Sequence, residues 1–366
     1  MSTHRTYYII DRTGREVLSS PYYIHGVTAE GYALVREEEN AFSVFNAADE
    51  SLHSLPKTWG NMALWYRLIG GSLIAYCINS KKGISSQIFV EKYLPGAFGK
   101  TIVASCVVNL DGVPLYEPRP YLLHHFDGAL GFAEDLEGRG FLINEAGEIT
   151  HSFPSAWRNY RCLDKSSQRL TNLEFERMDA YMRENKSFAV NLSNDKTYGP
   201  FKYIGHLSEG LRIIKNEQDV CFVLNSEWNP LFPFPEGTEK EFDSEFHHGH
   251  LAFVSKKNGR TGLLNKQGEV IVKSKSKYIT YLGSKYWFYS KGGLHGVMKD
   301  NGEIITPANY KVGSYSTPAL YGLIAVGNKG FRKGYINYDW EWVIPAKYSG
   351  CYNFKHPKYA VAFNDL

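Results

Sequence analysis

Gly296-Val-Met-Lys-Asp-Asn-Gly-Glu-Ile-Ile-Thr-Pro-Ala-Asn-Tyr310 and Gly334-Tyr-Ile-Asn-Tyr-Asp-Trp-Glu-Trp-Val-Ile-Pro-Ala-Lys-Tyr348 are two versions of one phrase. Each version has a glycine, an apolar pair, a polar residue that opens a turn, a second apolar pair, and a proline shortly before a tyrosine. A third version begins at Gly262, and the spacings between the three glycines are 34 and 38 residues. Self-similarity at such a period indicates tandem copies of one supersecondary unit.

The phrase can be followed back to the N-terminus with decreasing fidelity. The polar residue that opens each turn marks the copies at Asp11, Asn46, Asn109, Asn144, Asn191, Asn225, Asn265, Lys299 and Asn337. Two of the spacings between these residues, 63 and 47, are long. We therefore expect either inserts or one eroded copy in those two stretches.

Each copy has a physical interpretation as antiparallel strands. Asn or Asp at the first turn position and glycine at the fourth suit a tight type I turn, because the side-chain oxygen accepts from the backbone and glycine tolerates positive φ. The flanking apolar pairs are typical of a hairpin, and a companion phrase such as Leu207-Ser-Glu-Gly-Leu adds another strand. We expect three short strands per copy. The residues expected to be buried are Ile9, Leu142, Leu264, Val297 or Met298, and Ile336, and the glycines expected at positive φ are Gly147, Gly268 and Gly302.

The pattern resembles the WG-repeat proteins, a bacterial family of tandem units of this length. The resemblance is best over 260–348 and rests on the Gly-Φ-Φ-Asn-x-x-Gly-x-Φ-Ile-x-Pro-x-x-Tyr wording, where Φ is an apolar residue. The tryptophan that precedes the strand glycine in that family is replaced here by Arg139, Thr261, His295 and Lys333. The copies are therefore divergent. The resemblance implies a binding or scaffolding role and defines no ligand.

These observations predict an all-β protein in which 1–366 form a single array of tandem three-stranded units. A β-propeller-like closed toroid is preferred to an open superhelix, because closure removes exposed sheet edges. The last apolar run, Tyr359–Phe363, could pair with the first, Tyr7–Ile10. One helical insert is expected at 164–186, where apolar residues such as Leu173 and Met178 recur at spacings of mostly three or four residues.

Composition argues for a folded protein without an electrostatic signature. The chain is 15% aromatic and has 34 glycines, which is too apolar for disorder. A formal charge of +3 over 366 residues predicts no nucleic-acid partner. The N-terminus has no secretory signal and no segment is apolar enough to span a membrane, so we expect a cytoplasmic protein. Five scattered cysteines, an odd number, favour reduced thiols in the core.

Three groups of residues could carry chemistry, and each has a simpler interpretation. His247-His-Gly-His250 could bind a metal, but two imidazoles on one side without a cysteine make a poor zinc site, and the repeat alignment places His247 and His248 at turn positions. The acidic stretch 236–245 could supply the paired carboxylates of a glycoside hydrolase, although such a loop is more often solvated. Exposed aromatic residues could stack on sugars. The sequence has no nucleophile elbow, phosphate loop or dinucleotide motif, so we expect no catalytic residue, no cofactor and no bound metal.

The leading hypothesis is that the chain is a non-enzymatic, protein-binding repeat module in the cytoplasm. In the narrower version of this hypothesis, the chain is an immunity protein and its partner is a bacterial toxin that it neutralises. The alternatives are a glycan-binding β-propeller and a hydrolase on a propeller scaffold. The residue before the strand glycine varies among the copies, which argues against equivalent sugar sites. The features that differ most from the repeat wording mark the expected partner surface, which comprises Glu239, Glu241, His247, His248 and His250.

Overall fold

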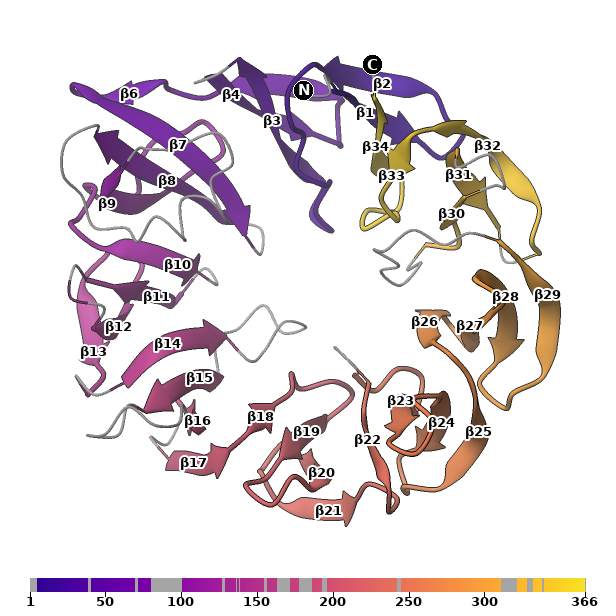
Figure 1. Cartoon of the computed structure of the whole chain (residues 1–366). Helices are drawn as coiled ribbons and strands as arrows, with labels where there is room; N and C mark the ends of the chain where they lie inside the picture. The colour runs from indigo at the N-terminus through magenta and orange to yellow at the C-terminus, as the bar shows by residue number, and fades with distance from the viewer. Residues whose placement is uncertain are drawn as a thin grey trace. The chain divides into compact units, whose positions relative to one another are not determined.

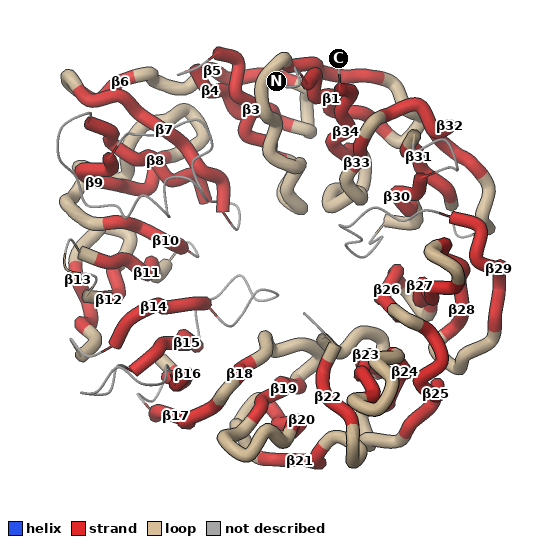
Figure 2. The backbone as a smooth tube through the Cα atoms, in the orientation of Figure 1, coloured by secondary structure: helices blue, strands red, loops and turns tan. Residues whose placement is uncertain are grey.

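The described part of this protein consists of β-strands, turns and loops. The computed structural model describes residues 5–38, 41–69, 72–79, 101–126, 129–135, 137, 139–154, 157–162, 172–177, 186–192, 196–241, 245–310, 321–327, 332–337 and 339–365. Within these ranges the strands form nine small antiparallel sheets and no helix occurs (Figures 1 and 2). None of these residues belongs to a helix that is long and apolar enough to cross a membrane.

The chain divides into two compact units, and the first contains both chain ends, mainly 1–158 and 348–366. Four sheets belong to it, with the strand orders β2-β1-β34-β33, β3-β4-β5, β6-β7-β8-β9 and β10-β11-β12-β13. The bounds are β1 (Arg5–Asp11), β2 (Glu16–Ser20), β3 (Tyr32–Glu38), β4 (Ala41–Asn46), β5 (Ser51–Ser54), β6 (Thr58–Trp59), β7 (Met62–Ile69), β8 (Ser72–Asn79), β9 (Thr101–Val108), β10 (Leu122–Phe126), β11 (Gly131–Glu134), β12 (Gly140–Ile143), β13 (Ile149–Ser152), β33 (Gly350–Cys351) and β34 (Tyr359–Asp365).

The second unit comprises mainly 159–347, and the boundary falls inside its first strand. Five sheets follow one another along the chain, each with its strands in sequence order. The bounds are β14 (Trp157–Cys162), β15 (Asn172–Arg177), β16 (Lys186–Asn191), β17 (Lys196–Phe201), β18 (Tyr203–Ile204), β19 (Leu211–Lys215), β20 (Cys221–Asn225), β21 (Pro230–Pro233), β22 (Thr238–Lys240), β23 (His250–Ser255), β24 (Thr261–Asn265), β25 (Val270–Ser276), β26 (Ile279–Gly283), β27 (Tyr286–Lys291), β28 (Leu294–Lys299), β29 (Ile304–Tyr310), β30 (Ile324–Gly327), β31 (Lys333–Ile336) and β32 (Trp342–Tyr348).

The expectation of three-stranded units is wrong for most of the sheets. Of the nine sheets, seven have four strands among the described residues, and only β3-β4-β5 and β30-β31-β32 have three. The strand that the sequence did not reveal is very short in four of these sheets: β6, β18 and β33 have two residues each and β22 has three. So short a strand shows no alternation of apolar and polar residues, and hydrophobic periodicity cannot detect it.

The predicted helical insert at 164–186 is also wrong where the structure describes it. β15 occupies Asn172–Arg177 and pairs with β16 over six residues, from Asn172 opposite Asn191 to Arg177 opposite Lys186. Residues 163–171 and 178–185, which include much of the proposed insert, lie outside the described residues. A spacing of three or four residues suits a helix only if no partner strand is available, and the pairing with β16 overrides that local preference.

The two ends of the chain meet in one sheet of the first unit. β1 and β34 pair antiparallel over seven positions, from Arg5 opposite Asp365 to Asp11 opposite Tyr359. The expected pairing of the last apolar run with the first is therefore confirmed. Because the hydrogen bonds of this pair join residues more than 340 positions apart, the sheet is completed only when the last strand is present.

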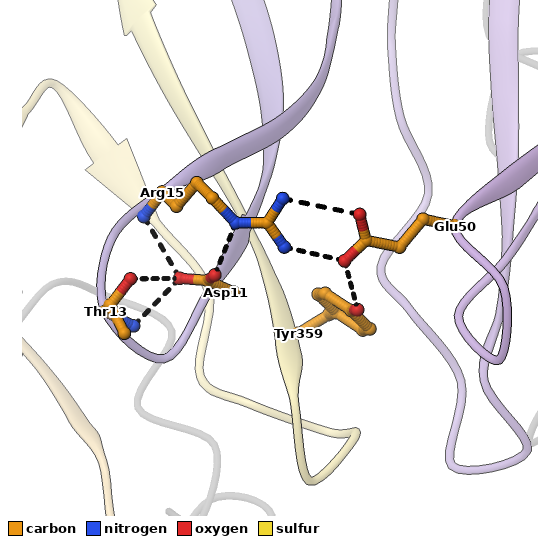
Figure 3. A network of polar contacts seen from close by, with 5 residues as sticks. All are labelled: Asp11, Thr13, Arg15, Glu50 and Tyr359. Atoms are coloured by element: carbon orange, nitrogen blue, oxygen red, sulfur yellow. Dashed lines mark hydrogen bonds and ion pairs between the residues drawn. The ribbon is translucent and has the colours of Figure 1, made fainter.

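A polar network ties this terminal sheet to the turn between β4 and β5 (Figure 3). Arg15 donates to both carboxylate oxygens of Glu50 at 2.7 and 3.4 Å, and the Tyr359 hydroxyl donates to the same carboxylate at 2.7 Å. Asp11 accepts from Thr13 and Arg15. Partial burial would raise the pKa of Asp11, but these hydrogen bonds outweigh it and hold the pKa at about 2. Asp11 therefore stays ionised and keeps the turn closed at neutral pH.

The turn that opens with Asn or Asp has the expected geometry. At Asn265 the backbone N–H donates to the Glu269 carbonyl and the backbone carbonyl accepts from the Gly268 N–H, both at 3.0 Å. The side-chain oxygen of Asn265 accepts from the backbone N–H groups of Gln267 and Glu269. The predicted positive-φ glycines are confirmed, with φ of 71° at Gly147, 81° at Gly268 and 85° at Gly302. The predicted core is confirmed as well, because the residues expected inside are at most 6% exposed.

Replacing Gly302 with valine is expected to lower the free energy of unfolding by about 1 kcal/mol or more. The φ of 85° strains any β-branched residue, and a Cβ at this position would approach Val272 to 3.1 Å. Thermal and urea unfolding of the variant would measure the loss. An unchanged midpoint would contradict the assigned turn. The same change at Gly26, which has open space and no positive φ, controls for the introduction of valine.

The strand glycine of the repeat phrase has a different physical cause, which is close approach of the backbone. A Cβ on Gly262, Gly296 or Gly334 would lie 2.4 to 2.6 Å from a carbonyl oxygen of the neighbouring outer strand. At Gly262 and Gly296 the pairing register shifts at this point, so the outer strand bulges toward the glycine. A bulge brings one carbonyl over the position where a side chain would begin, and only glycine leaves room for it.

In two sheets of the second unit the positive-φ turn position holds tryptophan in place of glycine. Trp228 has φ of 68° and Trp340 has φ of 67°. The Trp228 indole is 6% exposed and stacks on the Tyr198 ring of the preceding sheet, with centroids 4.5 Å apart and an interplanar angle of 11°. The Arg212 guanidinium lies 4.3 Å from the indole centroid. The Trp228 side chain of the turn thus fills the space between its own sheet and the preceding one. At Gly268 the turn has no side chain, and Phe232 of the preceding sheet occupies the corresponding space.

Four cysteines have described side chains and all are free thiols, as expected for a reduced core. Cys77, Cys106 and Cys221 are buried, and Cys351 is half-buried. Burial raises the pKa of Cys77 to about 11 and that of Cys106 to about 12. These two thiols are therefore protonated at neutral pH and unreactive. The side chain of Cys162 lies outside the described residues.

Candidate partner surface

The β22-β23-β24-β25 sheet carries all five residues that the sequence marks as a partner surface. The histidine turn, residues 247–250, joins β22 to β23 and is closed by reciprocal backbone hydrogen bonds of 2.8 and 3.0 Å. His248 and Gly249 have φ of 51° and 78°. The turn at 208–211 of the preceding sheet has the same form, with Glu209 at 52° and Gly210 at 77°. The repeat alignment of the histidines with turn residues is therefore correct.

His247 is part of the packing between neighbouring sheets. Its ring stacks on Tyr281 with centroids 4.2 Å apart and an interplanar angle of 4°, and it meets the edge of Trp287 at 6.4 Å. Burial lowers the pKa of His247 to about 4, against a smaller opposing effect of Glu209. The imidazole is therefore neutral at pH 7, and one face of the ring is covered by an aromatic neighbour.

His248 is the exposed member of the turn, with 54% of its side chain accessible. Its Nδ1 lies 3.3 Å from Asp300 Oδ2 in the turn between β28 and β29. The corresponding residue of the preceding sheet, Glu209, contacts Lys266 at 3.0 Å and accepts from the Gly249 backbone at 2.9 Å. Lys266 and Asp300 hold the same position in the repeat. The same inter-sheet contact thus recurs with the acidic side chain on the other of the two sheets.

The carboxylates that the sequence grouped with these histidines lie at the other end of β23. Glu239 lies opposite Val254 in the ladder and approaches Lys215 Nζ to 3.7 Å. Glu241 accepts from Thr261 Oγ1 at 3.2 Å. Four residues of extended strand, about 13 Å, separate Val254 from His250. The structure therefore divides the five residues into a histidine turn and a carboxylate pair. Residues 242–244, within the acidic stretch, lie outside the described residues.

Protein stability is expected to fall as the pH is lowered from about 6.5 to about 4, in part because of His247. The pKa of His247 is lower in the folded protein than in the unfolded chain, so the unfolded chain binds the proton more tightly. Protonation therefore favours unfolding, and the stability that is present above the unfolded pKa is lost as the pH falls toward the folded pKa. Exposure of part of the ring reduces the effect to roughly 2 kcal/mol. Urea unfolding at pH 7 and pH 4.5 would measure it, with His247→Gln expected to flatten the dependence. A His247→Gln variant with an unchanged pH slope would contradict the assignment. The exposed His248→Gln change is the control.

A histidine of the first unit, His124 in β10, is also held by a local contact. His124 Nε2 lies 2.8 Å from Glu134 Oε2 on the neighbouring strand. Among the described residues no group of three or more histidine, cysteine, aspartate or glutamate side chains is placed to hold a metal ion. The acidic stretch is not wholly a loop, because Thr238–Lys240 form β22.

One hollow in the first unit was not suggested by the sequence. It has a volume of about 510 Å³ and is bordered by Arg119, Tyr121, Phe141, Ile149 and Phe153, among others. Arg139 at its rim is paired with Asp135 at 2.6 Å. The hollow lies between the segment that leads into β10 and the strands β12 and β13. Its lining residues therefore come from separate stretches of the sequence, and no single sequence motif contains them. Periodicity offers no signal for such a site.

Comparison with known proteins supports the repeat and the fold. The model of the WG containing repeat matches residues 334–366. No curated protein is similar enough to this chain to count as a match. Among solved structures, a eukaryotic initiation factor superposes with a TM-score of 0.59 at 10% identity, covering 99% of this chain and 98% of that one. Dipeptidyl peptidase 4 of Porphyromonas gingivalis gives 0.49 at 11% identity, over 84% of this chain and 58% of that one.

At such identities a structural likeness shows the fold alone. The matched segment, 334–366, includes β32 and the two C-terminal strands that pair in the terminal sheet. The chain thus carries a WG containing repeat at its C-terminal end and has an all-β fold with propeller-like structural neighbours.

Proposed function

We propose that this chain is a non-enzymatic protein-binding repeat module. The observation that carries the proposal is an exposed apolar residue that recurs near the start of the outer strand in six sheets. These residues are Leu52, Ile149, Leu231, Val270 and Ile271, Ile304, and Trp342 and Val343, each at least 37% exposed. Isolated exposed apolar residues are ordinary, but recurrence at one structural position gives the successive outer strands β21, β25, β29 and β32 of the second unit a common apolar character that a partner can cover.

The finer architecture belongs to the same proposal. We take the other sheets as divergent copies of the repeat at 334–366, and the closed toroid as the arrangement of the array. The seven-position pairing of β1 with β34 supports closure, because an open superhelix would not need its two ends in one sheet. Small-angle scattering tests this point, since an open array has a longer maximum dimension. A scattering profile of an elongated particle would exclude the toroid.

The partner surface proposed from the sequence remains on the β22-β23-β24-β25 sheet. Because the structure separates its two parts, they are tested separately, with the double variants H248A/H250A and E239A/E241A. Each is expected to weaken capture of a stoichiometric partner from native cytosol severalfold while the melting temperature changes little, since surface contacts of this kind contribute about 1 kcal/mol or less. Pull-down and thermal unfolding measure the two effects.

A matched control replaces exposed charges away from this sheet, with E117A/E145A and K355A/K358A in the first unit. Capture that is unchanged in both test variants would place the partner elsewhere on the chain. Repeated failure of the unmodified protein to retain any stoichiometric partner would contradict the protein-binding function itself.

The narrower proposal for the partner is a bacterial toxin that this chain neutralises as a cytoplasmic immunity protein. The divergence of the copies supports it, because an immunity protein is matched to one partner and its exposed positions need not repeat. The coding neighbourhood tests it. A toxin gene beside this one would support the pairing, and its absence would remove the basis for it.

A further inference from the structure

A strongly basic segment stands out in a chain whose charge is otherwise balanced. Between residues 256 and 277 there are seven lysines and arginines and one carboxylate, Glu269, which gives a net charge of +6. The whole chain carries +3, so the remaining residues are net negative. The basic residues form no run longer than the pair Lys256 and Lys257, so a search for charge runs misses them and only a count over the whole segment detects them.

The fold brings six of these residues together on one side of the β22-β23-β24-β25 sheet. Lys273 and Lys275 on β25 and Lys277 just beyond it alternate along the chain, and all three are exposed. The turn between β23 and β24 carries Lys256, Lys257 and Arg260. It lies beside the end of β25, because Thr261 pairs with Ser276 and Arg260 donates to the Lys275 carbonyl. We call these six residues the basic face.

The basic face is not neutralised by the described carboxylates through ion pairs. Lys266 and Glu269 lie in the turn between β24 and β25, away from the face, where Lys266 is paired with Glu209. Glu241 is the carboxylate that approaches the face, by accepting from Thr261, whose hydroxyl also donates to the Lys277 carbonyl. Six like charges held near one another repel, and this arrangement contributes nothing to packing because the side chains are exposed.

Exposed apolar residues flank the charges on β25 and just beyond its end. Val270 and Ile271 are 43% and 39% exposed, and Tyr278 is 48% exposed with the Lys277 ammonium 5.4 Å from its ring. Apolar area beside charged residues is the composition of a protein interface. A nucleic-acid surface of this size would carry several aromatic platforms for the bases, and the face has one. β25 is also the outermost strand of its sheet, so its outer backbone edge is open to an added strand.

We propose that β25 and the 256–260 turn bind an acidic, extended segment of a partner protein. Its carboxylates lie against Lys273, Lys275 and Lys277, and its apolar side chains cover Val270 and Ile271. This inference rests on the proposed function, since it takes the ligand to be a protein. It adds the charge and conformation of the segment that is bound, and a site distinct from the histidine turn.

The test measures binding of a labelled peptide of alternating glutamate and valine to the full chain by fluorescence anisotropy. The comparison probes are an alternating glutamate–serine peptide and a single-stranded DNA of the same charge, together with phosphatidylserine vesicles. The glutamate–valine peptide is expected to bind most tightly, and K273E/K275E/K277E to weaken it by about tenfold or more. The control K291E/K355E/K358E changes the net charge equally at exposed lysines elsewhere and is expected to weaken binding less than about twofold.

Equal losses in the test and control variants would show a response to net charge and overturn the proposal. Tighter binding of the DNA or the vesicles than of the peptide would also overturn it. Partner capture distinguishes this inference from the proposed function. A partner captured equally well by K273E/K275E/K277E leaves the protein-binding function standing and removes the basic face. Peptide binding at the face without any captured partner supports the face and counts against the function.

Discussion

Replacing Trp228 with alanine is expected to lower the free energy of unfolding by about 3 to 5 kcal/mol, the range for deleting a large buried aromatic side chain. The indole is 6% exposed and lies between the Tyr198 ring and the Arg212 guanidinium, so its removal opens a cavity at the seam of two sheets. Arg212 is itself 1% exposed, and it would lose the aromatic surface that accompanies its buried charge. Urea unfolding followed by tryptophan fluorescence and circular dichroism would measure the change.

Two companion variants separate packing from backbone strain. Trp228→Gly removes the same indole but suits the φ of 68°, so it is expected to be no less stable than the alanine variant. Trp59→Ala removes a tryptophan that is 38% exposed and is expected to cost less than about 1 kcal/mol. A loss at Trp228 no larger than that at Trp59 would contradict the stacking as a source of stability.

Replacing Gly334 with alanine is expected to destabilise the protein by about 3 kcal/mol, at the upper end of the cost of overpacking. The added Cβ would lie 2.4 Å from the Ile344 carbonyl oxygen and 2.7 Å from backbone atoms of Pro345. A side chain in the way could rotate, but a backbone carbonyl in a paired strand can move only if β32 shifts away from β31. Differential scanning calorimetry would show the expected fall in melting temperature.

The matched control is Gly26→Ala, because a Cβ at Gly26 meets no atom within 4 Å and its φ is not positive. That variant is expected to be neutral or slightly stabilising, since alanine restricts the unfolded chain. A Gly334→Ala protein as stable as Gly26→Ala would show that β32 does not approach β31 as closely as described. The comparison tests the physical reason for the strand glycine of the repeat.

The candidate site shows where sequence reasoning ends. The alignment of His247 and His248 with turn residues was correct because a tight turn with two positive-φ residues is a local event. The grouping of the histidines with Glu239 and Glu241 relied on closeness in sequence, and the structure places them at opposite ends of β23. The six residues of the basic face are spread over about twenty positions and meet only because β25 folds back beside the 256–260 turn.

The repeat, the turns and the inward residues could be predicted from the order of the residues alone. The Asn-x-x-Gly turn forms through hydrogen bonds between residues a few positions apart, and the adjacent apolar residues Leu263 and Leu264, both fully buried, are visible in the local order of residues. The pairing of β1 with β34 could be anticipated for a different reason, since both terminal segments read as strands, although the pair joins residues more than 340 positions apart.

Long-range packing accounts for the fourth strand of most sheets, the strand at Asn172–Arg177 and the composition of the surfaces. Two- or three-residue strands such as β18 and β22 have no pattern of their own and exist because a longer neighbour offers hydrogen bonds. The spacing of apolar residues around Asn172–Arg177 predicts a helix, but the segment forms a strand because β16 provides backbone hydrogen-bond partners. Charge and apolar area on a face depend on which strands become neighbours, and that choice is set by the packing of the whole chain.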